Sequence, residues 1–234
     1  MSAPCSAAAG SEPLPRVALL AGATGLIGRA LLPLLLASDR FSAVHGLLRR
    51  ATPGLPTHPK LTLHTVDFAH LPAVFPVVDD VFIALGTTIK AAGSEAAFRQ
   101  VDFDFVVNTA RAAREAGATR LAIVSALGAD ARSRVFYNRV KGEMQAAVAA
   151  LGYESVLIAQ PSLLLGDRAA LDQPTRAVEV WASRLLAPVM GLIPKSVRPI
   201  DASTVAKAML TANLSGSRGV HILASGAMQA SVAR

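Results

Sequence analysis

Residues 17–28 read VALLAGATGLIG, and this stretch decides the fold. An apolar run at 17–21 meets three glycines, Gly22, Gly25 and Gly28, and a second apolar run follows at 26–36. The first run suits a buried parallel strand and the second suits a helix. Because glycine has no Cβ and tolerates a positive φ, the backbone can turn sharply here and another group can approach it closely.

A helix that begins on glycines presents free N–H groups and the positive end of its dipole to an anion. The pyrophosphate of a dinucleotide is the natural guest at such a turn. The spacing here is G-x-x-G-x-x-G, which differs from the general G-x-G-x-x-G fingerprint. The alternative is an ordinary strand–turn–helix in which the glycines serve only packing.

The composition predicts one folded domain, with room for a small appended lobe. The chain has 234 residues, of which 52% are hydrophobic and only 17% are charged, which suits a large core and excludes disorder. Its formal charge of +7 suits either nucleic acid or an anionic cofactor. The basic residues are scattered, with no run longer than Arg49-Arg50. We therefore expect an anionic cofactor and no nucleic-acid partner.

The N-terminal segment carries no recognisable targeting pattern. Residues 1–15 are rich in Ala, Ser and Pro and lack the charged start and apolar middle of a signal peptide, so we expect a flexible tail. The single cysteine, Cys5, excludes an intrachain disulfide and suits a reducing compartment. Together these features predict a cytoplasmic protein.

Neither a membrane span nor a metal site is expected. The apolar stretch 17–36 is long, but three glycines, Arg29 and Pro33 interrupt it, so a strand followed by a helix is the better interpretation. Pro33 predicts a bend or a short first helix. The five histidines show no metal-ligand spacing with one another or with Cys5.

Strand and helix patterns alternate along the rest of the chain, which predicts an α/β fold with a doubly wound parallel sheet. Expected strands lie at 17–21, 44–48, 61–66, 80–85, 119–125, 154–159 and 220–223, and expected helices at 26–36, 94–116, 135–151 and 201–213, the last with Asp201 as its N-cap. Ligands bind at the carboxyl ends of such strands. The residues at those ends are Gly22, Arg49, Asp67, Gly86, Ser125 and Pro161.

The pattern changes after Pro161. Residues 162–200 predict a small C-terminal substrate lobe over the strand ends, within a single domain that spans 16–234. Candidates for lining the substrate pocket are Leu164, Trp181, Met190 and Arg198, although ordinary packing or a solvated surface would explain each of them as well.

Three residues form a candidate reacting group. Tyr137 and Lys141 are four residues apart and therefore share one helix face, and Ser125 ends the preceding strand. A lysine ammonium beside a phenol favours the phenolate. Serine can hold a carbonyl or alcohol oxygen, so the set can exchange a proton with that oxygen while a nicotinamide exchanges a hydride with its carbon. A surface pair at helical spacing is the plainer alternative.

At this point the chain resembles the short-chain dehydrogenase/reductase superfamily. The segment GATGLIG, the serine and YNRVK stand in the expected order, and the resemblance covers about residues 16–225. The GATGLIG form is typical of the extended and atypical branches. The segments SALGAD, FYNRVKGEM and QPSLLLGDR are similar to the atypical reductases of the Tat-interacting, NADPH-binding type and their bacterial relatives.

The resemblance implies a Rossmann fold, bound NADP(H) and a catalytic set of Ser125, Tyr137 and Lys141. It also implies that the cofactor lies against Gly22, Thr24, Gly25, Leu26, Ile27, Gly28, Asp67, Phe68, Ala84, Leu85, Gly86, Tyr137, Lys141, Pro161, Ser162 and Leu163. The chain departs from the extended branch at Asp102, where those enzymes usually carry asparagine, and it is too short for their full substrate domain.

The end of the second strand predicts the choice of dinucleotide. An NAD site usually places an acidic residue there to bind the ribose hydroxyls, whereas this chain has Arg49 and Arg50. Guanidinium groups suit a 2′-phosphate through charge-assisted hydrogen bonds, so we predict NADP rather than NAD. A solvated basic loop would give the same pattern.

The sequence thus predicts an NADP-dependent oxidoreductase that acts on a small carbonyl or alcohol. Two alternatives stay open: an NADP(H)-sensing regulatory or scaffold protein with little catalysis, and a nucleotide-sugar epimerase or dehydratase. The expected partner is a small-molecule substrate, and the chain is expected to be a monomer or a homodimer.

Overall fold

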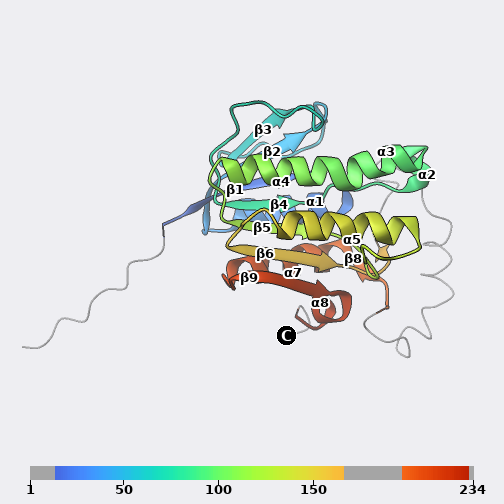
Figure 1. The fold of residues 1–234 in the computed structure, drawn as a ribbon. Coiled ribbons are helices and arrows are strands. Elements are labelled where there is room, and N and C mark those ends of the chain that lie inside the picture. Colours follow the sequence, from blue (N-terminus) through green and yellow to red (C-terminus); the bar gives the residue numbers. More distant parts are fainter. Residues whose placement is uncertain (1–13, 166–196, 232–234) are drawn as a thin grey trace, which may run out of the picture.

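One parallel sheet organises the protein. The computed structural model describes residues 14–165 and 197–231. Seven strands within them pair in the order β3-β2-β1-β4-β5-β6-β9, all parallel (Figure 1). Their bounds are β1 Arg16–Ala21, β2 Phe41–Leu48, β3 Leu61–Thr65, β4 Asp80–Ile83, β5 Arg120–Val124, β6 Ser155–Gln160 and β9 Gly219–Ala224. The order runs outward from β1 in both directions, which confirms the doubly wound sheet and puts its switch point between β1 and β4.

Helices cover both faces of the sheet. On one face lie α1 (Leu26–Ala37), α7 (Ala202–Leu214) and α8 (Ser225–Ser231), and on the other lie α4 (Phe105–Glu115) and α5 (Phe136–Ala149). Figure 1 shows α4 and α5 side by side in front of the sheet. Each face has its own apolar core, because successive residues of the buried strands point in opposite directions.

Shorter elements lie beyond the carboxyl ends of the strands. They are α2 (Ile89–Ala92), α3 (Glu95–Arg99), the π-helix η1 (Gln100–Asp104) and a two-stranded sheet of β7 (Leu164–Leu165) and β8 (Ile200–Asp201). The expected flexible tail and most of the expected lobe at 162–200 lie outside the described residues.

Two helices differ from their predictions. The helix expected at 94–116 is divided into α3, η1 and α4, although Ser94 does cap it, with Oγ accepting a hydrogen bond from the Ala97 N–H at 3.1 Å. Pro33 does not shorten α1, which continues to Ala37. Pro33 lies on the exposed face of the helix, where water can hydrate the carbonyl that proline leaves unbonded. Asp201 stands at the N-cap of α7 but makes no side-chain capping bond.

A buried polar cluster ties the two sides of the switch point to α7. Arg16 of β1 lies 3.1 Å from the Asp80 carboxylate of β4, and the Asn213 amide of α7 donates to the same carboxylate at 2.6 Å. Burial raises the pKa of Asp80 more than Arg16 and Asn213 lower it. The cluster lies at the amino ends of the strands, opposite the edge where ligands bind.

Glycine permits close backbone contacts at the turn between β1 and α1. Gly22 has a φ of +93°, and a Cβ there would lie 2.6 Å from the carbonyl oxygen of Ala84. A Cβ on Gly28 would lie 1.9 Å from the carbonyl oxygen of Gly22. These contacts join the ends of β1 and β4 to the first turn of α1, and any larger residue would push them apart.

We predict that Gly28→Ala lowers the free energy of unfolding by about 3 kcal/mol or more, because its Cβ would meet rigid backbone. Gly46→Ala is the matched control: its Cβ would meet Leu63 Cδ2 at 2.7 Å, the far end of a flexible side chain that is 42% exposed. That variant should lose less than about 1 kcal/mol. Urea unfolding measures both, and equal losses would contradict the steric argument.

Candidate functional site

The turn between β1 and α1 is open to an anion. Gly25 stands at the N-cap of α1 without a side-chain bond, and no acidic residue lies in the first turn. The helix therefore presents its first N–H groups, from Leu26 onward, without helical partners. A Cβ on Gly25 would make only ordinary contacts, the nearest at 3.5 Å, so protein packing does not require glycine there. The position leaves room for close approach of a ligand to the backbone, and the turn fits a pyrophosphate.

The predicted cofactor residues of the first turn differ in how far their side chains are buried. Thr24, Gly25 and Leu26 are partly exposed, whereas Ile27 is 5% exposed and packs in the core beneath the turn. Gly28 contributes the space that its missing side chain leaves. Ligand contact at these positions therefore comes mainly from backbone N–H groups and from the three partly exposed residues.

The end of β4 links this turn to the reacting group. The Ala84 N–H donates to the Ala21 carbonyl at 2.8 Å, so β4 stays paired with β1 up to the glycine turn. Gly86, two residues later, is exposed. A Cβ on Gly86 would lie 3.3 Å from Asp102 Oδ1 and 3.9 Å from Lys141 Nζ. The predicted cofactor segment Ala84, Leu85 and Gly86 thus lies directly beside the lysine of the reacting group.

Lys141 forms a buried ion pair with Asp102. Lys141 Nζ lies 2.6 Å from Asp102 Oδ1, and the two side chains are only 4% and 1% exposed. The second carboxylate oxygen of Asp102 accepts a hydrogen bond from the Thr87 N–H at 2.8 Å. Asp102 therefore fixes Lys141 to the loop that follows β4.

Tyr137 lies one turn before Lys141 on α5, at the same helix interface. Its ring packs against the buried ring of Phe98, with centroids 5.3 Å apart. Phe98 in turn precedes Asp102 by four residues. The contacts Phe98–Tyr137 and Asp102–Lys141 are therefore successive layers of one interface between α3–η1 and α5.

Ser125 ends β5 and is 4% exposed. Its Oγ accepts a hydrogen bond from Gln145 Nε2 at 2.6 Å, and Gln145 Oε1 accepts one from Gln160 Nε2 at 3.2 Å. Gln145 lies one turn after Lys141, so Tyr137, Lys141 and Gln145 follow one another along α5. Gln145 and Gln160 are not among the residues predicted from the sequence. The i+4 spacing of Gln145 from Lys141 does indicate that the two share a helix face.

The second and third strands end in polar residues. Arg49 and Arg50 are exposed directly after β2 and form no ion pair with any residue in the described ranges. Asp67 follows β3, where the Ala69 N–H and the His70 ring lower the pKa of its carboxylate. The Phe68 side chain is 3% exposed and stacks on Phe105, so it belongs to the core and is not open to a ligand.

The segment after β6 is tied to the C-terminal part of the chain. Pro161 is buried, and its carbonyl accepts a bond from the Leu127 N–H at 2.9 Å. The Ser162 hydroxyl donates to the Arg198 carbonyl at 2.5 Å and lies 2.9 Å from Ser225 Oγ, and the Leu163 carbonyl accepts from the Ile200 N–H. Ser162 therefore already has protein partners. Of the four pocket candidates, Leu164 lies in β7 and Arg198 precedes β8, while Trp181 and Met190 lie outside the described residues.

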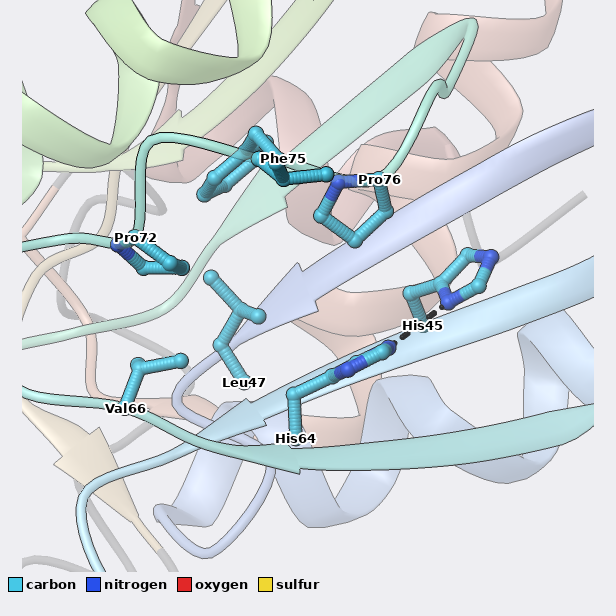
Figure 2. A pocket seen from close by; sticks show the side chains of 8 residues that line it. His45, Leu47, His64, Val66, Pro72, Phe75 and Pro76 are labelled. Atoms are coloured by element: carbon cyan, nitrogen blue, oxygen red, sulfur yellow. Dashed lines mark hydrogen bonds between the residues drawn. The ribbon is translucent and has the colours of Figure 1, made fainter.

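A separate cavity of about 300 Å³ lies over β2 and β3 (Figure 2). His45 and His64 lie at one side of it, with Nδ1 of His45 2.8 Å from Nε2 of His64, and Pro72, Phe75 and Pro76 close it from above. Burial and the neighbouring His64 lower the pKa of His45. None of the lining residues belongs to the predicted site, so this cavity is distinct from it.

In residues 14–165 and 197–231 no three His, Cys, Asp or Glu side chains gather as they would around a metal ion. Over the same ranges no helix is both long enough and apolar enough to cross a bilayer.

Comparison with known proteins identifies the class of domain. Residues 22–163 match the family described as NAD(P)H-binding. The mitochondrial protein fmp52 of Emericella nidulans is 31% identical over 216 residues, which are 88% of this chain and 90% of that protein. The mitochondrial FMP52 of Eremothecium gossypii is 36% identical over 151 residues, or 64% of this chain and 67% of that protein.

Solved structures share the fold at low identity. The oxidoreductase ylbE from Lactococcus lactis aligns with a TM-score of 0.60 and 14% identity, over 93% of this chain and 97% of that one. A UDP-glucose 4-epimerase from Thermotoga maritima, solved with UDP-glucose, aligns with a TM-score of 0.64 and 14% identity, over 90% and 77% of the two chains. MoeE5, solved with UDP-glucose and NAD, has a TM-score of 0.64 and 17% identity, over 88% and 74%.

These comparisons overturn one prediction and support others only in a more general form. The predicted cytoplasmic location is wrong, because the relatives from Emericella, Eremothecium and Aspergillus terreus are all named mitochondrial proteins. The comparisons place the chain with NAD(P)-binding domains and do not separate NADP from NAD or single out the Tat-interacting type.

We predict that Lys141→Met lowers the free energy of unfolding at neutral pH by about 3–5 kcal/mol, because it leaves the buried Asp102 carboxylate without its counter-ion. The double variant Asp102→Asn, Lys141→Met should recover at least about 1 kcal/mol of that loss, since it removes the unpaired charge. Lys207→Met, on the exposed face of α7, is the control and should be nearly neutral. Urea unfolding measures each variant. If the double variant lost as much stability as the two single variants together, Asp102 and Lys141 would not be energetically coupled.

Proposed function

This chain belongs to the NAD(P)H-binding family, and we propose that it is an NADP-dependent oxidoreductase of the short-chain dehydrogenase/reductase type that acts on a small carbonyl or alcohol. One observation carries the proposal. The glycine turn that fits a pyrophosphate and the buried Lys141 lie on the two sides of the segment Ala84–Leu85–Gly86, so one extended dinucleotide can reach both.

Different groups of the chain would bind the cofactor and the substrate along that segment. The N–H groups at the start of α1 would hold the pyrophosphate, and Lys141 would hold the ribose next to the reacting end. Nicotinamide, when bound, supplies or accepts the hydride. The Ser125 hydroxyl has its oxygen fixed by Gln145 Nε2, so its hydrogen remains available to donate to a substrate oxygen. Tyr137 would exchange a proton with that same oxygen.

The preference for NADP is supported by the end of β2. Arg49 and Arg50 are exposed there, in the position where an NAD site places a carboxylate. Two guanidinium groups can form charge-assisted, bidentate hydrogen bonds with a 2′-phosphate. Asp67, at the end of β3, would lie on the adenine side of the same pocket.

The proposal also covers where the protein is located and whether it is an enzyme or a sensor. The names of the relatives support a mitochondrial location for this chain. A role in sensing NADP(H) would use the glycine turn and Arg49 but would not need Tyr137, so the tyrosine separates an enzyme from a sensor.

Tyr137→Phe should keep the affinity for NADPH and lose turnover by about 100-fold or more, because it removes only the proton donor. The readout is NADPH oxidation across a panel of small aldehydes and ketones, with NADPH affinity measured by titration calorimetry. Tyr153→Phe is the control, since Tyr153 donates to the Ala110 carbonyl inside the core and lies away from the site. Retention of full turnover by Tyr137→Phe would refute the catalytic role, and tight binding of NADPH without oxidation of any substrate by the wild type would favour the sensor.

Arg49→Ala and Arg50→Ala should each weaken NADPH binding by about 10-fold or more and leave NADH binding unchanged, because only NADPH carries the 2′-phosphate. Arg40→Ala removes the same charge just before β2, at the opposite edge of the sheet, and should leave both affinities unchanged. An equal loss of NADH and NADPH affinity would show that the arginines do not read the phosphate.

A further inference from the structure

The ion pair at the centre of the site changes what Tyr137 faces. A lone Lys141 ammonium would favour the phenolate of Tyr137, but Asp102 Oδ1 lies 2.6 Å from Lys141 Nζ in a place where water scarcely reaches either group. A carboxylate this close to the ammonium opposes the effect of that ammonium on a group one helical turn away. Tyr137 therefore lies beside a neutral pair and not beside a cation.

We propose that Asp102 is a positioning and charge-setting residue: it holds Lys141 in place, cancels its charge and so keeps Tyr137 as a phenol, the form that donates a proton. An oxidising site needs the phenolate as its base, whereas a reducing site needs the phenol as its acid. The pair Asp102–Lys141 thus preserves the acid form that the reduction step consumes. This consequence for catalysis rests on the proposed function, but the charge effect on Tyr137 does not.

The fold places Asp102 for this role. The π-helix η1 interrupts the helical run at residues 100–104, and such turns are frequent at functional sites. It presents Asp102 to α5 in the layer next to the contact between Phe98 and Tyr137. With the Thr87 N–H on Oδ2 and Lys141 on Oδ1, both carboxylate oxygens have partners, which fixes the orientation of the carboxylate.

Most other charged residues around Tyr137 have partners of their own. Arg99 of α3 is joined to Glu143 of α5, so these two also cancel, and Asp130 in the loop before α5 accepts a bond from the Arg132 N–H. Lys90 lies exposed on α2. Arg134 is exposed in the loop before α5, and Arg139 donates to the Ser133 carbonyl and lies over the Phe136 ring. Both arginines are the same in every variant compared below, so they cannot cause a difference between the variants.

The chain offers a direct measurement of this effect. It contains only two tyrosines, Tyr137 and Tyr153. Burial raises the pKa of Tyr153 far above that of an ordinary phenol. Alkaline titration of the near-ultraviolet tyrosinate absorbance therefore reports Tyr137, and Tyr137→Phe supplies the blank. The titration needs neither a substrate nor turnover.

Asp102→Asn should form tyrosinate at a pH lower than the wild type by about one unit, because Lys141 then faces Tyr137 uncancelled. Lys141→Met should move the titration in the opposite direction, because only the carboxylate remains. Loosening of the fold cannot produce two opposite shifts. Asp104→Asn is the matched control: it removes the same charge from the exposed side of the same π-helix and should titrate as the wild type does. Circular dichroism over the same pH range checks that each variant stays folded.

The outcomes separate this inference from the proposed function. Coincident titrations of Asp102→Asn, Asp104→Asn and the wild type, or a shift of Asp102→Asn to higher pH, would overturn the role of Asp102. If the expected shifts appear and the wild type reduces no carbonyl, the charge effect stands and the enzymatic proposal fails. If both hold, the pH at which carbonyl reduction declines should be lower in Asp102→Asn, matching the tyrosinate titration.

Discussion

The backbone contact between Gly28 and the Gly22 carbonyl is the constraint on which the site depends. It forces α1 to begin directly at the end of β1, and the contact of Gly22 with Ala84 sets the end of β4 against the same point. A parallel sheet whose order reverses between β1 and β4 opens a crevice there. The glycines place backbone N–H groups at that crevice without side chains of their own, which suits an anion.

The second half of the site depends on how two helices meet. Phe98, Asp102, Val106 and Ala110 are all buried and are spaced four residues apart. A regular α-helix has 3.6 residues per turn, so residues at this spacing would drift around its surface. The wider turn of η1 compensates for part of that drift. Phe98 can therefore meet Tyr137 while Asp102 meets Lys141, and the rest of α4 still packs on the sheet.

Much of this arrangement follows from local sequence, and the remainder does not. Continuous apolar runs that end at glycine predict the strands, because a strand buried on both faces is apolar at nearly every position. The division of 94–116 into three elements is not visible locally, since no glycine or proline stands at residues 99–105 to mark it. The bond of Gln145 to Ser125, the stacking of Phe68 on Phe105 and the contact of His45 with His64 each join residues far apart in the chain. A spacing rule within one helix or strand cannot reach such pairs.

The distribution of charge shows how a basic chain can hold a neutral reacting site. The formal charge is +7, yet Lys141 is cancelled by Asp102 and Arg99 by Glu143 near Tyr137. At the end of β2, Arg49 and Arg50 are exposed to solvent and form no ion pair with a described residue. This end of the crevice therefore offers uncancelled positive charge to a phosphate. The other end can keep a phenol protonated, because a charge that strengthens anion binding would there remove the proton that the reaction needs.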